Sequence, residues 1–138
     1  MELRCVSKSP TAEQRLRLGS FLGSRDREFP VELAVKYRCY SVRVWGCGLW
    51  VVIEGFPSQL VSVPLCLFEI VDSRLPPFWE TWSDADGDLE IGSPTLQDRG
   101  FFDDLSEGIS EALAALERLR EEHVRWEALR DVRIVSTD

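Results

Sequence analysis

Three aspartates alternate along one short stretch of the chain: Asp84, Asp86 and Asp88. A calcium-binding loop begins with this spacing, because alternate side chains of such a loop supply oxygen ligands. The remainder of the loop is missing, since Leu89 occupies the sixth position, which requires glycine, and Thr95 the twelfth, which requires glutamate. The Asp-Gly pair at positions 86–87 is typical of a hairpin turn. The sequence therefore predicts a turn with exposed carboxylates and no calcium site.

A second acidic group consists of Asp103, Asp104 and Glu107. Neighbouring carboxylates of this kind suit general acid–base chemistry. They also stand directly before a helical pattern, where negative side chains stabilise the positive end of the helix dipole. We favour the capping role for these residues.

Nucleophilic chemistry has one candidate pair. Cys47 lies between two glycines, and His123, the single histidine, would be the base that forms its thiolate. His123 falls on the apolar side of a predicted helix, where a buried histidine is the commoner situation. The four cysteines, at positions 5, 39, 47 and 66, include no Cys-x-x-Cys pair for zinc. We therefore expect free thiols, no metal, no cofactor and no enzyme.

Charge divides the chain into unlike halves. Residues 1–79 carry ten Lys/Arg and eight Asp/Glu, a net charge of +2, whereas residues 80–138 carry six and sixteen, a net charge of −10. The total of −8 argues against nucleic-acid binding, which needs clustered basic side chains. An acidic surface without catalytic residues suits a protein that binds a basic partner.

The first half of the chain predicts a short helix followed by strands. Thr11 and Gln14 have the spacing of a capping box, so a helix should follow Pro10 and end near Leu18. Alternation of apolar and polar residues predicts a half-buried strand over 31–39, a bulge at 39–41 and a hairpin around Gly46-Cys47-Gly48. A central strand over 49–53 and a further strand over 65–71 complete this half, with Pro64 at a strand start or an edge.

The second half predicts a hairpin around Asp86-Gly87 and a long helix from about Asp104 to Arg130, with Ser110 as a rival start because Gly108 weakens a first turn. Residues 132–135 are read as a last short strand or a tail. The fold class is therefore α+β: one domain over 1–138, with an antiparallel sheet of about five or six strands, a short N-terminal helix and a long C-terminal helix. No apolar run is long enough for a secretion signal or a membrane span, so we expect a cytoplasmic protein.

Four segments carry a resemblance to a known group of proteins. They are residues 5–11 (CVSKSPT), 29–33 (FPVEL), 63–72 (VPLCLFEIVD) and 102–108 (FDDLSEG). Together they resemble small bacterial cytoplasmic proteins similar to the immunity proteins that accompany polymorphic toxins. The likeness covers most of residues 1–122 and brings no active-site motif. It implies a protein that neutralises a cognate toxin domain by covering it.

The leading hypothesis is such an immunity-type protein, whose partner is a basic toxin domain. Its predicted contact set combines aromatic anchors with acidic residues: Trp79, Glu80, Trp82, Asp84, Asp86, Asp88, Glu90, Asp98, Asp103 and Asp104. An ordinary solvated acidic surface is the rival reading of these residues.

Two other function classes stay open. One is a small-molecule-binding or enzymatic domain with a pocket formed by Tyr40, Cys47, Trp50 and His123. The other is a homo-oligomeric adaptor whose C-terminal helix pairs with a copy of itself through Leu113, Leu116, Leu119 and Trp126. The protein would be a monomer or a homodimer, with no contact to nucleic acid or membrane.

Overall fold

A computed structural model of the chain describes residues 1–18, 28–46, 48–83, 87–98 and 100–136, the last seven by their backbone alone. Seven strands are present: β1 (Glu2–Cys5), β2 (Lys36–Trp45), β3 (Gly48–Phe56), β4 (Gln59–Pro64), β5 (Phe68–Asp72), β6 (Glu80–Ser83) and β7 (Leu89–Gly92). The helices of the described residues are α1 (Ala12–Leu18), α2 (Phe101–Ser106) and α3 (Ser110–Ser136), together with the 3₁₀ turns η2 (Leu65–Leu67) and η3 (Pro94–Gln97). The predicted α+β class, with one antiparallel sheet and helices at both ends of the chain, is confirmed.

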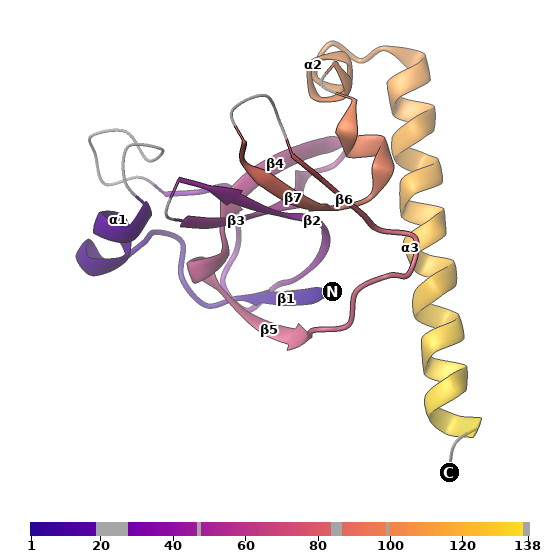
Figure 1. Ribbon diagram of the computed structural model, residues 1–138, viewed down its shortest axis with the longest axis horizontal. Coiled ribbons are helices and arrows are strands. Elements are labelled where there is room, and N and C mark those ends of the chain that lie inside the picture. The colour runs from indigo at the N-terminus through magenta and orange to yellow at the C-terminus, as the bar shows by residue number, and fades with distance from the viewer. Residues whose placement is uncertain (19–27, 47, 84–86, 99, 137–138) are drawn as a thin grey trace.

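The strand β2 organises the sheet, whose strand order is β4-β3-β2-β1-β5. Its first residues, 36–38, pair with β1, and residues 41–44 pair with β7, which in turn pairs with β6. The change of neighbour follows a register shift between Cys39 and Ser41, which confirms the predicted bulge. Because a bulge bends its strand, β1 and β5 curl under the remaining strands (Figure 1).

Two apolar cores lie on either side of β3. Val51 and Ile53 belong to the core enclosed by the curled sheet, together with Leu3 of β1 and Val63 of β4. Val52 belongs to the second core, which the sheet shares with α2, α3 and η3. This division follows from the two-residue period of side chains along a strand.

Capping explains the helix boundaries. The backbone N–H of Thr11 donates to Gln14 Oε1 (2.9 Å) and the N–H of Gln14 donates to Thr11 Oγ1 (3.1 Å), which confirms the predicted capping box of α1. At the other end of the chain, Gly108 has a φ of 71°, and the N–H of Ile109 donates to the carbonyl of Asp104 (3.0 Å). This left-handed glycine terminates α2 and starts α3 afresh at Ser110.

Several predicted elements differ from the structure. The helix expected from about Asp104 to Arg130 is two helices, so Asp104 lies in the first turn of α2 and does not cap α3. Residues 132–135 continue α3 and form no strand. The sheet also gains β1, where every second residue is buried, and so has seven strands.

The predicted strand over 31–39 begins only at Lys36, because Ala34 has a φ of 65° and turns the chain. Leu33, which the alternation assigned to the buried face, is 57% exposed. In the predicted strand over 65–71, the first three residues form η2, and β5 begins at Phe68. Pro64 ends β4, an edge strand, as expected.

Candidate functional site

Trp79 is part of the protein interior. Its side chain is 9% exposed, and its indole Nε1–H donates to Nε2 of His123 on α3, which is 1% exposed, at 3.0 Å. The rings of Tyr40 and Phe78 meet the imidazole edge to face at 4.8 Å and 5.0 Å. Trp79 therefore anchors the segment before β6 to α3, and its expected place in a contact surface is wrong.

His123 is held in one tautomer. Because Nε2 accepts from Trp79, the proton resides on Nδ1, which lies 2.8 Å from the carbonyl oxygen of Leu119. Burial lowers the pKa of His123 to about 4, and the bond to Leu119 only partly opposes this. Both ring nitrogens are engaged in packing α3 onto the body, which leaves neither available to deprotonate a thiol.

The cysteines have the properties of structural thiols. Burial raises the pKa of Cys39 to about 12, and it also raises the pKa of Cys5 and of Cys66. Cys47, the proposed nucleophile, lies outside the described residues. Among the described residues, no group of three or more His, Cys, Asp or Glu side chains is placed to hold a metal ion.

The pocket expected from Tyr40, Cys47, Trp50 and His123 is not assembled. The rings of Tyr40 and His123 are in contact, but each residue is only 1% exposed, so the two side chains are part of the packed interior. Trp50 belongs to the other core, where it packs against Phe29 and Trp45. Trp50 therefore lies on the other side of the sheet from Tyr40 and His123, and Cys47 lies outside the described residues.

Self-pairing of α3 through the expected leucines also conflicts with the structure. Leu116 and Leu119 are each 1% exposed and pack inside the second core, while Trp126 is half-buried. Leu113 alone of the four is exposed, at 37%. Leu116 and Leu119 therefore hold α3 against its own sheet.

Glu90 is occupied within the protein. It lies opposite Arg43 across the β2–β7 ladder, and Arg43 Nε is 2.8 Å from Glu90 Oε1. Arg43 donates to Ser62 Oγ (2.9 Å), and its guanidinium covers the ring of Phe102 at 5.0 Å. This charge network fixes α2 over the sheet, so Glu90 has a structural role. Trp82, directly opposite Glu90 on β6, is half-buried against the second core.

The other described members of the predicted set lie on the surface. Glu80, Asp98, Asp103 and Asp104 are exposed and Asp88 is half-buried, whereas Asp84 and Asp86 lie outside the described residues. Glu80 shares the face of β6 on which Trp82 packs, because side chains two apart on a strand point the same way. Asp103 and Asp104 occupy the first turn of α2, at the top of Figure 1.

The predicted contact set left out four further surface residues of this region. Glu107 follows α2, and Glu111 is in the first turn of α3; both are exposed. Beside them, Ile109 and Leu113 are 42% and 37% exposed. The available signal was the four-residue spacing of this apolar pair, which places both side chains on one face of a helix. We call the carboxylates Asp98, Asp103, Asp104, Glu107 and Glu111 the acidic end; Glu80 lies lower, beside Trp79 and the middle of α3.

Several carboxylates of the body are paired with arginines. Glu54 of β3 binds Arg120 of α3 through both oxygens, and Glu127 of α3 binds Arg38 of β2 in the same way, at 2.7 Å and 3.0 Å. Both bridges join the sheet to α3: in the first the sheet supplies the carboxylate, and in the second it supplies the guanidinium. Within the part of the chain that the structure describes, none of the five carboxylates of the acidic end forms an ion pair. The acidic end therefore carries carboxylates without ion-pair partners in and around α2, beside the N-terminus of α3, the helix that the two bridges hold to the sheet.

The chain matches no protein-family model, no curated protein and no solved structure. Among the described residues, no helix is both long enough and apolar enough to cross a bilayer.

Proposed function

We propose that this protein is an immunity-type inhibitor that covers a basic bacterial toxin domain with its acidic end. The observation that carries the proposal is a group of carboxylates in and around α2 that are exposed and form no ion pair among the described residues, whereas Glu54, Glu90 and Glu127 of the body bind arginines. Unpaired surface charge of one sign steers a partner of the opposite sign and raises the association rate.

An apolar centre supports the same surface. Ile109 and Leu113 stand one helical turn apart; in sequence, Glu107 precedes this pair and Glu111 lies between its two members. Interfaces commonly place an apolar anchor inside a charged rim, where the rim governs encounter and the anchor slows dissociation. We therefore assign the first turns of α3 to the middle of the contact surface and the carboxylates to its margin.

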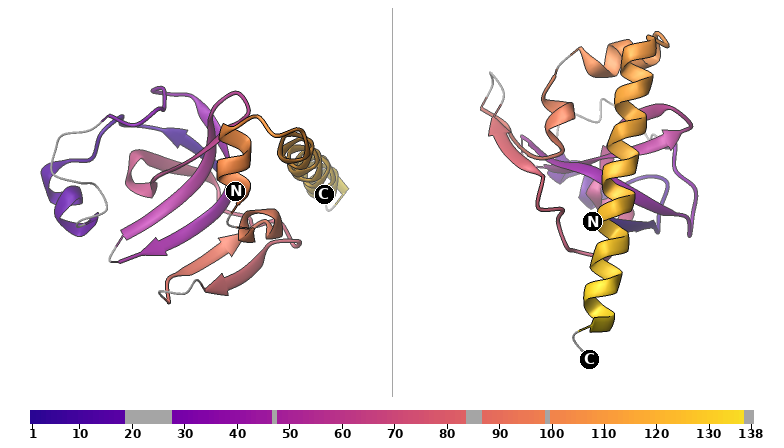
Figure 2. Two further views of the ribbon diagram at one scale, coloured as in Figure 1. Left: turned by 90° about the horizontal axis from the view of Figure 1, so that it is seen from above. Right: turned by 90° about the vertical axis from the view of Figure 1, so that its right-hand side faces the viewer.

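Rigidity favours an inhibitor that docks without reshaping. The Glu54–Arg120 and Arg38–Glu127 bridges and the His123–Trp79 bond hold α3 to the sheet at three levels. Figure 2 shows α3 as a straight rod along one side of the body, with α2 at its N-terminal end. A surface that is already ordered loses little conformational entropy on binding.

The test is capture of the partner from the native cell at low and at moderate salt, followed by kinetics with the captured domain. In the acidic-end variant, Asp103→Asn, Asp104→Asn and Glu107→Gln are combined. A control variant removes the same charge from other exposed sites through Glu28→Gln, Glu32→Gln and Glu122→Gln. We expect the acidic-end variant to associate about tenfold more slowly at low salt, with a flatter salt dependence.

Leu113→Ala tests the apolar centre separately. We expect association to be nearly unchanged and dissociation to accelerate about tenfold, as for an anchor worth more than about 1 kcal/mol. Equal effects of the acidic-end and control variants on association would contradict the proposal, because net charge alone would then account for them.

A further inference from the structure

The edge strand β5 differs from the other edges of the sheet. It pairs only with β1 among the described strands, and it exposes apolar side chains on both of its faces: Ile70 is 49% exposed and Val71 is 40% exposed. In the edge strand β4, by contrast, Leu60 and Val63 are buried. Open apolar edges of this kind are templates for pairing with another strand, and proteins normally protect them with charge or cover.

An apolar groove of about 390 Å³ adjoins this edge. Phe68 and Ile70, two residues apart on β5, form one wall, and Leu18 of α1, Leu49 of β3 and Leu65 of η2 form the others. The groove continues the exposed face of Ile70. A strand added to β5 would therefore find both free backbone groups and a place for one apolar side chain, the combination used in recognition by strand addition.

We propose that the occupant is a second copy of this chain, and that two β5 strands pair antiparallel about a two-fold axis at Ile70. Such an axis, perpendicular to the sheet, must pass through a residue that faces its own copy, because side chains directly opposite each other share a face. With the axis at Ile70, each Ile70 lies against the other at the rim of the groove. All five residues of β5 are then paired.

The charges of β5 are compatible with this register and disfavour the neighbouring register at Glu69. With the axis at Ile70, Glu69 faces Val71 of the other copy and Asp72 faces Phe68, so no like charges are opposed. With the axis at Glu69, the two Glu69 carboxylates would face each other, which destabilises a strand pair. Arg4 Nη1 lies 2.6 Å from Glu69 Oε1 and Arg74 Nη2 lies 2.8 Å from Asp72 Oδ2, so both acids are already neutralised within their own chain.

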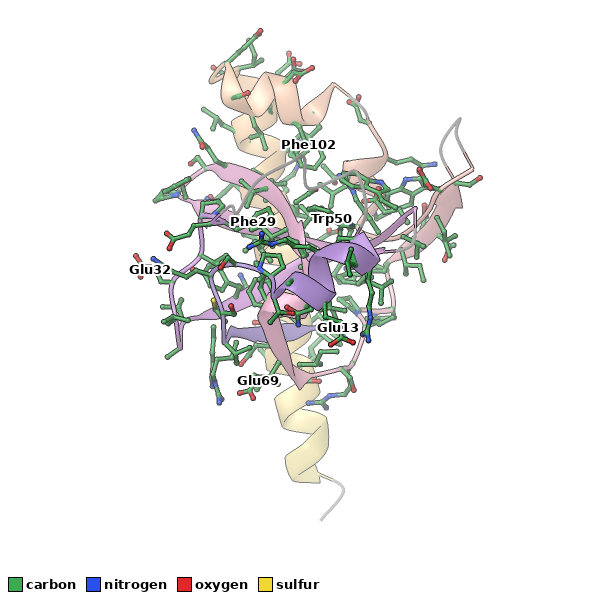
Figure 3. All side chains as sticks on the ribbon, turned by 90° about the vertical axis from the view of Figure 1, so that its left-hand side faces the viewer. Glu13, Phe29, Glu32, Trp50, Glu69 and Phe102 are labelled. Atoms are coloured by element: carbon green, nitrogen blue, oxygen red, sulfur yellow. The ribbon has the colours of Figure 1, made fainter. Side chains whose placement is uncertain are left out.

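This interface leaves the acidic end uncovered. Figure 1 shows β5 and α2 at opposite ends of the molecule, and Figure 3 shows the same separation between Glu69 and Phe102. A dimer through β5 would carry two acidic ends pointing away from each other. The inference does not depend on the proposed function, since it concerns only copies of this chain.

The experiment is sedimentation equilibrium of the full chain from about 1 µM to about 1 mM, the range in which small interfaces dissociate. We expect the mass to rise with concentration from 15.8 kDa to about twice that value. Ile70→Lys, which sets two ammonium groups against each other, should raise the dissociation constant at least about tenfold. Val71→Lys should keep or strengthen the dimer, because its ammonium would face Glu69 of the other copy. Leu16→Lys is the matched control, because Leu16 lies on α1 and is 83% exposed.

A wild-type chain that stays at 15.8 kDa over the whole range would overturn the proposal. The proposal would also be overturned if Val71→Lys raised the dissociation constant as much as Ile70→Lys does. Equal effects at the two positions would indicate a nonspecific apolar contact and not this register. If Ile70→Lys does not fold, Ile70→Cys in a Cys47→Ser, Cys66→Ser background replaces it. Rapid formation of an Ile70→Cys disulfide dimer, absent for Leu16→Cys, supports the register, and equal rates at both sites refute it.

Discussion

Mild acidification should destabilise this protein through His123. The folded protein holds the imidazole neutral with a pKa of about 4, whereas the unfolded chain takes up a proton near the ordinary value of 6.5. The unfolded state therefore binds more protons as pH falls through this window, and the stability of the fold declines. The stabilisation is present above about pH 6.5 and is lost progressively toward pH 4.

The size of the effect follows from the two pKa values. Each pKa unit corresponds to about 1.4 kcal/mol, so the full loss is about 3 kcal/mol, and about 2 kcal/mol of it falls between about pH 7.5 and about pH 5. Glu54 contributes little in this window. Burial raises the pKa of Glu54, but the hydrogen bonds from Arg120 and Ser58 bring it below 4.5, so Glu54 titrates at lower pH.

Urea unfolding at these two pH values, followed by circular dichroism, measures the change. His123→Gln is the control, because an amide can still accept from Trp79 but does not titrate. The wild type should lose about 2 kcal/mol between about pH 7.5 and about pH 5, and the variant much less. Equal losses in the two proteins would refute the assignment of His123 as a buried neutral base.

Three further perturbations test the packing of the fold. In thermal unfolding, Gly92→Ala should destabilise the protein by about 3 kcal/mol, because the added Cβ would lie 2.2 Å from the Cβ of Ser41. Gly100→Ala is the control and should be nearly neutral in the same assay, because the nearest atom to its Cβ, Asp98 Oδ1, is 3.5 Å away. Gly108→Ala forces a left-handed alanine between α2 and α3 and should cost about 1 kcal/mol in urea unfolding. A double-mutant cycle on Glu54 and Arg120 should give a coupling energy of about 1 kcal/mol, since both side chains are partly exposed, and additive single effects would show that the bridge contributes nothing.

Local sequence signals predicted local structure well. The capping box of Thr11 and Gln14 and the bulge after Cys39 are set by residues a few positions apart, and both are confirmed. The turn at Ala34 was missed because alanine carries no preference for positive φ, and only the surrounding fold holds it there. Gly108 gave a partial signal: it argued against a helix start, and the structure shows that it separates two helices.

Long-range partners account for the errors in the predicted surface. Trp79 looked like an exposed anchor because its hydrogen-bond acceptor, His123, lies 44 residues away. Glu90 looked like free negative charge because Arg43 reaches it only after β2 and β7 have paired. The sequence pattern located the acidic half of the chain, whereas the pairing with arginine, which separates structural carboxylates from free ones, depends on tertiary contacts.

Neutralisation in cells tests the central claim most directly. The captured partner domain would be expressed in a host cell alone, with the wild-type protein, with the acidic-end variant or with the control variant. We predict that the domain alone arrests growth, that the wild type and the control variant restore it, and that the acidic-end variant restores it less at equal expression. Growth restored equally by the acidic-end variant, or no protection by the wild type, would contradict the account.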